Sequence, residues 1–206
     1  MTGDVIRPLI ETAHTLIAGT TGSGKSVLLN DVIRYLIDEG PIGSLCHFFD
    51  LKRVELKEYQ EESICSQYIT EPEDVLDELD FIIFMMDERY KEMTGKKTDK
   101  FPIYVVIDEL GYLLDVDGAL ERLVTIGRLG RAANIHLLCC TQDPSRRTLP
   151  AQLMQNFTCT VALRCRSAIE SRQIIGIPGA ESLPQYGYAY RWDANGIEKF
   201  AVPFSE

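Results

Sequence analysis

The stretch HTLIAGTTGSGKSVLLN, residues 14–30, decides the fold of this chain of 206 residues. Its first six residues form an apolar run that ends in glycine, which predicts a short buried strand. From Gly24 onward the apolar residues recur with helical spacing until the pair Gly40 and Pro41, which predicts a helix. Between strand and helix lies GTTGSGKS, residues 19–26, which fits the pattern G-x-x-x-x-G-K-[ST] completely. That pattern in that setting predicts a phosphate-binding loop.

The residue types of this loop are those that bind the phosphates of a nucleotide. Its glycines let the backbone curl so that N–H groups face a phosphate chain, and the following helix adds the positive end of its dipole. Lys25 is expected to reach the outer phosphates, and the hydroxyl of Ser26 is expected to ligate Mg²⁺. ATP and Mg²⁺ are therefore the predicted cofactors. The residues expected to bind the nucleotide are Gly19, Thr20, Thr21, Gly22, Ser23, Gly24, Lys25, Ser26 and Val27.

A second motif supplies two acids at a strand end. FPIYVVIDE, residues 101–109, is an apolar run that closes on Asp108 and Glu109. We expect Asp108 to complete the magnesium shell and Glu109 to orient and polarise the attacking water. Beside a phosphate-binding loop, these acids favour a catalytic ATPase over a passive nucleotide binder.

The remaining pattern is an alternation of strands and helices. The Asn195-Gly196 pair lies between two extended runs, which predicts a C-terminal hairpin. The alternation predicts an α/β fold with a mainly parallel sheet and helices on both faces. The length fits a single domain over residues 1–206. Further strands are expected at 44–50, 65–69, 135–141 and 159–165, and helices at 73–93, 118–133 and 150–157.

Composition limits the possible partners and compartment. The net charge of -10 argues against a protein that coats nucleic acid through overall basicity, although a local basic strip is compatible with it. The N-terminus lacks the features of a signal peptide, and no apolar run has the length of a membrane span. We therefore expect a cytoplasmic protein without direct membrane insertion. The cysteines form no CxxC pair and are expected to be reduced core residues. They are Cys46, Cys65, Cys139, Cys140, Cys159 and Cys165.

The segment ERLVTIGRLGRAANIH, residues 121–136, combines glycines and arginines in an expected helix. Each glycine costs a helix about 1 kcal/mol relative to alanine, so a plain solvated helix does not explain them. Arg128 and Arg131 are expected on one helix face. They either contact the C-terminal helix dipole or reach an ATP held by a neighbouring subunit. Gln142, just past the next strand, has a position suited to sensing the outermost phosphate.

Six segments, in this order, resemble the motor domain of the FtsK/SpoIIIE DNA translocases, part of the wider FtsK–HerA group of hexameric ATPases. They are residues 14–30, FFDLKRVEL (48–56), YVVIDEL (104–110), GRAANIHLLCCTQDPS (130–145), SAIESRQIIG (167–176) and GAESL (179–183). The resemblance covers roughly residues 12–192. It implies a RecA-like P-loop ATPase core and a ring of six subunits with double-stranded DNA threading its centre.

The resemblance also assigns roles to single residues. Lys25 and Ser26 match the phosphate-loop pair of the family, and Asp108 and Glu109 match its second, acidic motif. Arg131 matches the arginine expected to act across the subunit boundary. Gln142 matches the sensor glutamine of the family.

The chain departs from the family at two positions expected to contact DNA. The family usually reads TQRPS where this chain has Asp143, and Gln155 replaces another basic residue. An acid facing a phosphate backbone would repel it. Arg146 and Arg147 directly follow Pro144 and Ser145, and they are expected to face the DNA in place of the two missing basic residues.

The family's membrane-spanning N-terminus and winged-helix module have no counterpart in these residues. We therefore expect the protein to consist of little more than the motor domain. A small motor of this kind suggests a phage, plasmid or other mobile element, in transfer or packaging. Two alternatives stay open: a type VII secretion-like ATPase that translocates polypeptides, and a regulatory protein that uses ATP as an assembly switch.

Overall fold

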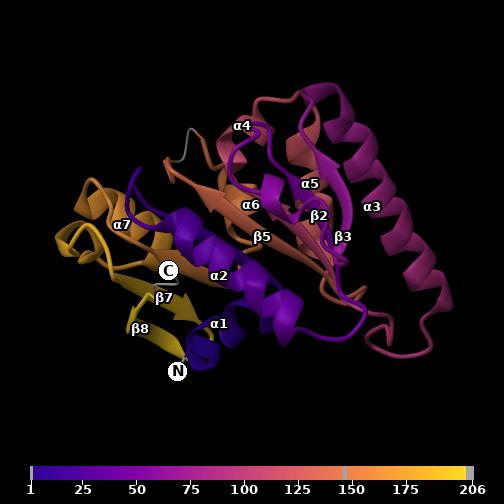
Figure 1. Cartoon of the computed structure of the whole chain (residues 1–206), viewed down its shortest axis with the longest axis horizontal. Helices are drawn as coiled ribbons and strands as arrows, with labels where there is room; N and C mark the ends of the chain where they lie inside the picture. Colours follow the sequence, from indigo (N-terminus) through magenta and orange to yellow (C-terminus); the bar gives the residue numbers. More distant parts are fainter. Residues whose placement is uncertain (1, 146–147, 203–206) are drawn as a thin grey trace.

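The computed structural model describes residues 2–145 and 148–202, and their strands form one sheet in the order β3-β2-β4-β5-β1-β6-β7-β8. The pairings among β1 to β6 are parallel, whereas β7 pairs antiparallel with β6 and with β8. This arrangement confirms the predicted α/β fold with a mainly parallel sheet (Figure 1). The strands are β1 (His14–Ala18), β2 (Leu45–Phe49), β3 (Cys65–Ile69), β4 (Ile103–Ile107), β5 (Ile135–Thr141), β6 (Cys159–Ala162), β7 (Tyr188–Asp193) and β8 (Gly196–Ala201).

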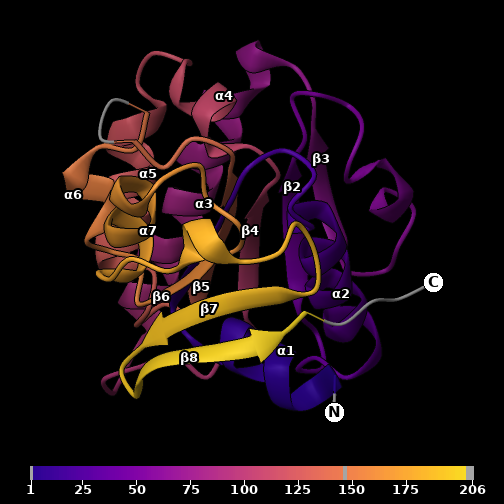
Figure 2. The ribbon, with the colours of Figure 1, turned by 90° about the vertical axis from the view of Figure 1, so that its left-hand side faces the viewer.

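Helices cover both faces of the sheet, as predicted. Residues of α1 and α2 pack in one apolar cluster with β2, β6 and the hairpin, and residues of α3, α4 and α5 pack in a second cluster on the opposite face. Figure 2 shows the β7–β8 hairpin beside α1. The α-helices are α1 (Thr2–Glu11), α2 (Lys25–Asp38), α3 (Pro72–Glu92), α4 (Leu110–Leu114), α5 (Ala119–Leu129), α6 (Ala151–Met154) and α7 (Ala168–Ile175).

The central strands are buried on both sides, which explains their continuous apolar runs. Every residue of β1 and β4 is buried. The structure pairs none of the six cysteines, and all but the half-buried Cys65 are buried, so five of them lie in the core; their reduced state stays a prediction. Among the described residues, no helix combines the length and the apolar character that crossing a bilayer requires.

The helix expected at 118–133 ends earlier, at Leu129. A Cβ on Gly130 would lie 2.6 Å from the carbonyl oxygen of Ile126 and 2.7 Å from that of Ile135. A Cβ on Gly127 would lie 2.9 Å from the Cβ of Asn156. Both glycines therefore allow backbone and side chains to approach closely, and this packing offsets their helix cost.

The early end of α5 also corrects the expectation for its arginines. Arg128 is in the last turn of the helix, but Arg131 lies in the turn that leads to β5, so the two do not share a helix face. Helices α1, α4 and α7 have no counterpart among the sequence-based expectations. The C-terminal hairpin is confirmed, with Gly196 at a φ of +108° where the second strand begins.

Candidate nucleotide site and its strand-end network

The phosphate-binding loop connects β1 to α2 at the carboxyl end of the parallel strands. Gly22 and Gly24 have φ angles of +73° and +96°, a region that side-chain-bearing residues rarely adopt. The backbone N–H of Thr20 donates to the carbonyl of Arg164, 2.9 Å away, just beyond β6. The loop is thus a fixed turn that requires its glycines.

Lys25 is the first residue of α2, and its side chain folds back over the loop. Its Nζ donates to the carbonyl oxygens of Gly19 and Thr20 at 2.7 and 3.0 Å. Burial lowers the pKa of this ammonium group. Lys25, Ser26 and Val27 line a cavity of about 340 Å³.

The predicted acids follow β4, and Asp108 lines the same cavity as Lys25 and Ser26. Asp108 is 8% exposed, and its Oδ2 atom has no hydrogen-bond partner in the described part of the chain. Burial, with a contribution from the nearby Asp50, raises the pKa of Asp108 to about 7. A hydroxyl and a carboxylate on one cavity are the oxygen donors that Mg²⁺ prefers, and a buried oxygen without a partner fits a ligand. Ser26 and Asp108 therefore fit a magnesium ion.

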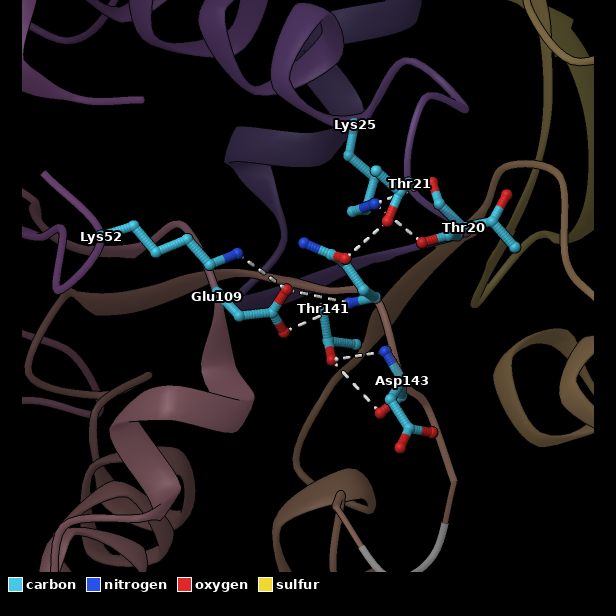
Figure 3. A network of polar contacts seen from close by, with 9 residues as sticks. Thr20, Thr21, Lys25, Lys52, Glu109, Thr141 and Asp143 are labelled. Atoms are coloured by element: carbon cyan, nitrogen blue, oxygen red, sulfur yellow. Dashed lines mark hydrogen bonds and ion pairs between the residues drawn. The ribbon is translucent and has the colours of Figure 1, made fainter. Parts of the chain in front are cut away.

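Glu109 lies in a network of polar contacts that joins three segments of the chain (Figure 3). The backbone N–H of Gln142 donates to both carboxylate oxygens of Glu109 at 3.2 Å. The side chain of Gln142 in turn accepts a hydrogen bond of 2.7 Å from the hydroxyl of Thr21 in the phosphate-binding loop. The ends of β4 and β5 are thereby tied to the loop; the role of Gln142 as a phosphate sensor stays a prediction.

Lys52 is a residue of this site that sequence reasoning missed. Its Nζ lies 3.4 Å from Oε2 of Glu109 and 5.0 Å from the centre of the Tyr112 ring. The turn that carries Lys52 is held by Asp50, which accepts the backbone N–H groups of Val54 and Leu56. The only sequence signal is the motif FFDLKRVEL, whose residues become neighbours of Glu109 because β2 pairs with β4.

Arg131 is not brought to this cluster within one chain. It is exposed and precedes β5, whereas Gln142 follows the same strand. The seven residues of β5 separate the two by about 20 Å, at a rise of roughly 3.3 Å per residue. Arg131 instead lines a cavity of about 660 Å³ at the opposite edge of the sheet, with His136 and Asn195. Its action across a subunit boundary stays a prediction.

The positions expected to face DNA have local structural roles. The carboxylate of Asp143 accepts the hydroxyl of Thr148 at 2.7 Å and the backbone N–H of Ser145 at 3.0 Å, and these bonds lower its pKa. Asp143 therefore closes the loop after β5. Gln155 ends α6 and is exposed. Arg146 and Arg147 lie outside the described residues.

Comparison with known proteins identifies the family. The model of the FtsK/SpoIIIE family matches residues 3–111, more than half of the chain. The DNA translocase FtsK of Agrobacterium fabrum is 30% identical over 97% of the chain. The chain belongs to the FtsK/SpoIIIE family. It spans 28% of the length of that FtsK/SpoIIIE relative.

Solved structures agree with the RecA-like P-loop fold. The pCW3 conjugation coupling protein TcpA, as a monomer with ATPγS, has a TM-score of 0.80 and 24% identity, covering 94% of this chain and 61% of TcpA. The cytoplasmic domain of the type VII secretion ATPase EccC from Thermomonospora curvata has a TM-score of 0.73 and 25% identity, covering 94% of this chain and 26% of EccC. The same fold thus occurs in a conjugation coupling protein and in a type VII secretion ATPase.

Proposed function

We propose that the chain is the ATP-hydrolysing motor of a cytoplasmic ring, of six subunits, that moves double-stranded DNA. The observation that carries the proposal is the meeting of Lys25, Asp108, Glu109 and Gln142 at one edge of the sheet, with Arg131 exposed at the other. This separation of Arg131 from the other site residues suits a site that the Arg131 of a neighbouring subunit completes. A relative that aligns with 97% of the chain is named DNA translocase FtsK. That name supports DNA as the substrate.

The site residues divide the binding of ATP among them. The N–H groups of the phosphate-binding loop and the ammonium group of Lys25 hold the phosphates, and Lys25 exchanges its carbonyl partners for phosphate oxygens. Ser26 and Asp108 hold Mg²⁺, which supplies charge neutralisation on the phosphates when bound. Asp108 must lose its proton for this role, and its raised pKa makes binding depend on pH near neutrality.

Glu109 orients the attacking water and accepts its proton. Both of its oxygens now contact the N–H of Gln142, and Oε2 also contacts Lys52, so Glu109 must turn from these partners to act as a base. Gln142 contacts the phosphate-binding loop through Thr21 and precedes the loop closed by Asp143. A change at the outermost phosphate is thereby transmitted to the residues that face the substrate.

Arg131 of the next subunit completes the site in this proposal. A guanidinium group brought to the phosphates stabilises the charge that develops during phosphoryl transfer. In a ring, each subunit offers its phosphate-binding loop to one neighbour and its Arg131 to the other. The coupling protein TcpA shares the fold, which supports a setting in transfer between cells, on a plasmid or another mobile element.

The test is steady-state ATP hydrolysis with and without linear double-stranded DNA, for the wild type and for Arg131→Ala. Strong stimulation by DNA that is lost in the variant is the expected result. If DNA does not change the rate of hydrolysis, the assignment as a DNA motor is refuted. If Arg131→Ala hydrolyses ATP as fast as the wild type does, the proposed site shared between subunits is refuted.

A polypeptide-translocating ATPase is a second candidate, favoured by the acidic residue at position 143 and by the net charge of -10. The similarity to the EccC cytoplasmic domain supports this candidate. The same assay separates the two functions if an unfolded polypeptide, reduced and carboxymethylated α-lactalbumin, is added in place of DNA. Stimulation by the polypeptide but not by DNA would replace the first proposal with the second.

A further inference from the structure

Tyr186, in the loop before β7, lines the same cavity as the phosphate-binding loop. We propose that its ring is the surface on which the base of the bound nucleotide stacks. The inference rests on the proposed binding of ATP and adds the residue that recognises the base. Tyr186 is the one aromatic residue among those that the structure places on this cavity.

The sheet order places Tyr186 opposite the acids. Asp108 and Gln142 follow β4 and β5, on one side of β1, whereas Tyr186 precedes β7, beyond β6 on the other side. The cavity therefore extends across the phosphate-binding loop, from the acids on one side to the aromatic ring of Tyr186 on the other. A nucleoside triphosphate has the same polarity, with charged phosphates at one end and a flat π-system at the other. The phosphates and metal ligands fix which end of the nucleotide lies at the acids.

The loop that carries Tyr186 is anchored on both sides. Leu183 is buried in the apolar cluster beneath α7, and the carbonyl of Gly187 accepts the backbone N–H of Val202 at 3.1 Å. The Nε2 atom of Gln185 lies 3.5 Å from the position that a Cβ on Gly22 would occupy. The loop thus lies against the phosphate-binding loop, which holds the ring close to the nucleotide.

Tyr186 is 64% exposed, so the folded chain leaves this large aromatic residue mostly uncovered. Tyr188, two residues further on, is also exposed, but it contacts Lys199 in a cation–π arrangement, with 4.9 Å between Nζ and the ring centre. Tyr188 is not among the residues found on the cavity. It therefore offers a matched control for removing an exposed aromatic ring from the same region.

The experiment measures binding of ATP and of inorganic tripolyphosphate to the whole chain by displacement of a fluorescent ATP analogue, with Mg²⁺ present. Tyr186→Ala should weaken ATP binding roughly 5- to 150-fold, the range for loss of one base–aromatic stack. Its affinity for tripolyphosphate, which has no base, should be unchanged. Tyr186→Phe should bind ATP as the wild type does, because the ring remains. Tyr188→Ala should bind both ligands as the wild type does.

The outcomes separate this inference from the proposed function. If the wild type binds neither ATP nor tripolyphosphate, ATP binding itself is refuted. If the wild type binds both and Tyr186→Ala retains its affinity for ATP, only the stacking role is refuted. An equal loss of both ligands in Tyr186→Ala would also refute it, because the ring would then shape the phosphate site instead of holding the base. Failure of Tyr186→Phe to restore ATP binding would overturn stacking in the same way.

Discussion

The backbone N–H of Gln142 donates to both carboxylate oxygens of Glu109 at 3.2 Å. Glu109 is 6% exposed, and its Oε2 atom also lies 3.4 Å from Nζ of Lys52. The residue proposed to activate water is therefore held by the strand end that carries the proposed phosphate sensor. In the proposed mechanism, movement of Gln142 and release of Glu109 are coupled through this contact, so hydrolysis is expected to depend on the position of the loop after β5.

We expect Glu109→Gln to lower ATP hydrolysis by about 10²- to 10⁴-fold, the usual contribution of a general base, while ATP binding is retained. The amide keeps one oxygen that can accept the N–H of Gln142, so the fold of the strand end is preserved. Single-turnover hydrolysis and displacement of a fluorescent ATP analogue measure the two effects. Glu121→Gln, an exposed substitution at the start of α5, is the matched control. Full activity in Glu109→Gln would show that Glu109 is not the general base.

Asp108 makes the stability of the chain without nucleotide depend on pH. Its pKa is raised to about 7, so the folded chain keeps a proton that the unfolded chain has already lost above about pH 4. Folding stability therefore falls as the pH rises from about 4 to about 7, and the cost is fully present above pH 7. Removing the charge with Asp108→Asn removes this cost.

We expect Asp108→Asn to stabilise the chain by on the order of 2 kcal/mol at about pH 8, with a gain that shrinks toward pH 4. Urea unfolding across this pH range measures the difference. Glu62→Gln, which also removes a carboxylate but at an exposed position, should show no such trend. The same Asp108 variant should bind ATP more weakly in the presence of Mg²⁺. A gain that does not vary with pH would contradict the proposed origin of the pKa shift.

Gly130 is expected to tolerate no side chain. In Gly130→Ala the new Cβ would meet two backbone carbonyl oxygens at 2.6 and 2.7 Å, neither of which can move without shifting α5 or β5. Overpacking of this kind costs about 1–3 kcal/mol, and because Gly130 follows the helix, alanine there does not gain the full roughly 1 kcal/mol that it gains over glycine inside a helix. Thermal unfolding should show a lower Tm for this variant. Gly95→Ala, where a Cβ meets nothing within 4 Å, should leave the Tm unchanged, and an equal effect of both would contradict the steric account.

Local patterns predicted those parts of the site whose geometry is set by adjacent residues. The phosphate-binding loop is one turn, and its spacing alone places Lys25 and Ser26. Asp108, Glu109 and Gln142 follow strands of a parallel sheet, so their meeting at one edge could be expected before the strand order was known. The positions of Lys52 and Tyr186 depend on which strands pair, because β2 lies beside β4 and β7 lies beyond β6. No short-range pattern contains that information.

The end of α5 shows the same limit. The apolar spacing continues past Leu129 to Ala133, and Gly130 is a local stop signal that does not decide the end by itself, because Gly127 lies inside the helix. The helix ends there because Gly130 passes beneath β5, whose amide at Ile135 donates to the carbonyl of Gly130 at 2.9 Å. That contact between helix end and strand also places Arg131 in the turn at the amino-terminal edge of the sheet. The proposed contact across subunits thus depends on a tertiary feature.

Mixing two inactive variants tests the proposed shared site most directly. Lys25→Ala removes the phosphate-binding lysine, and Arg131→Ala removes the arginine offered to the neighbour, so each variant alone should hydrolyse almost no ATP. Each interface of a ring pairs the loop of one subunit with the arginine of the next, so random mixing makes about a quarter of the interfaces wild type. The equimolar mixture should therefore regain hydrolysis of up to that fraction. Arg128→Ala, an exposed arginine three residues earlier, should be active alone. A mixture no more active than its components would show that Lys25 and Arg131 do not act in one site.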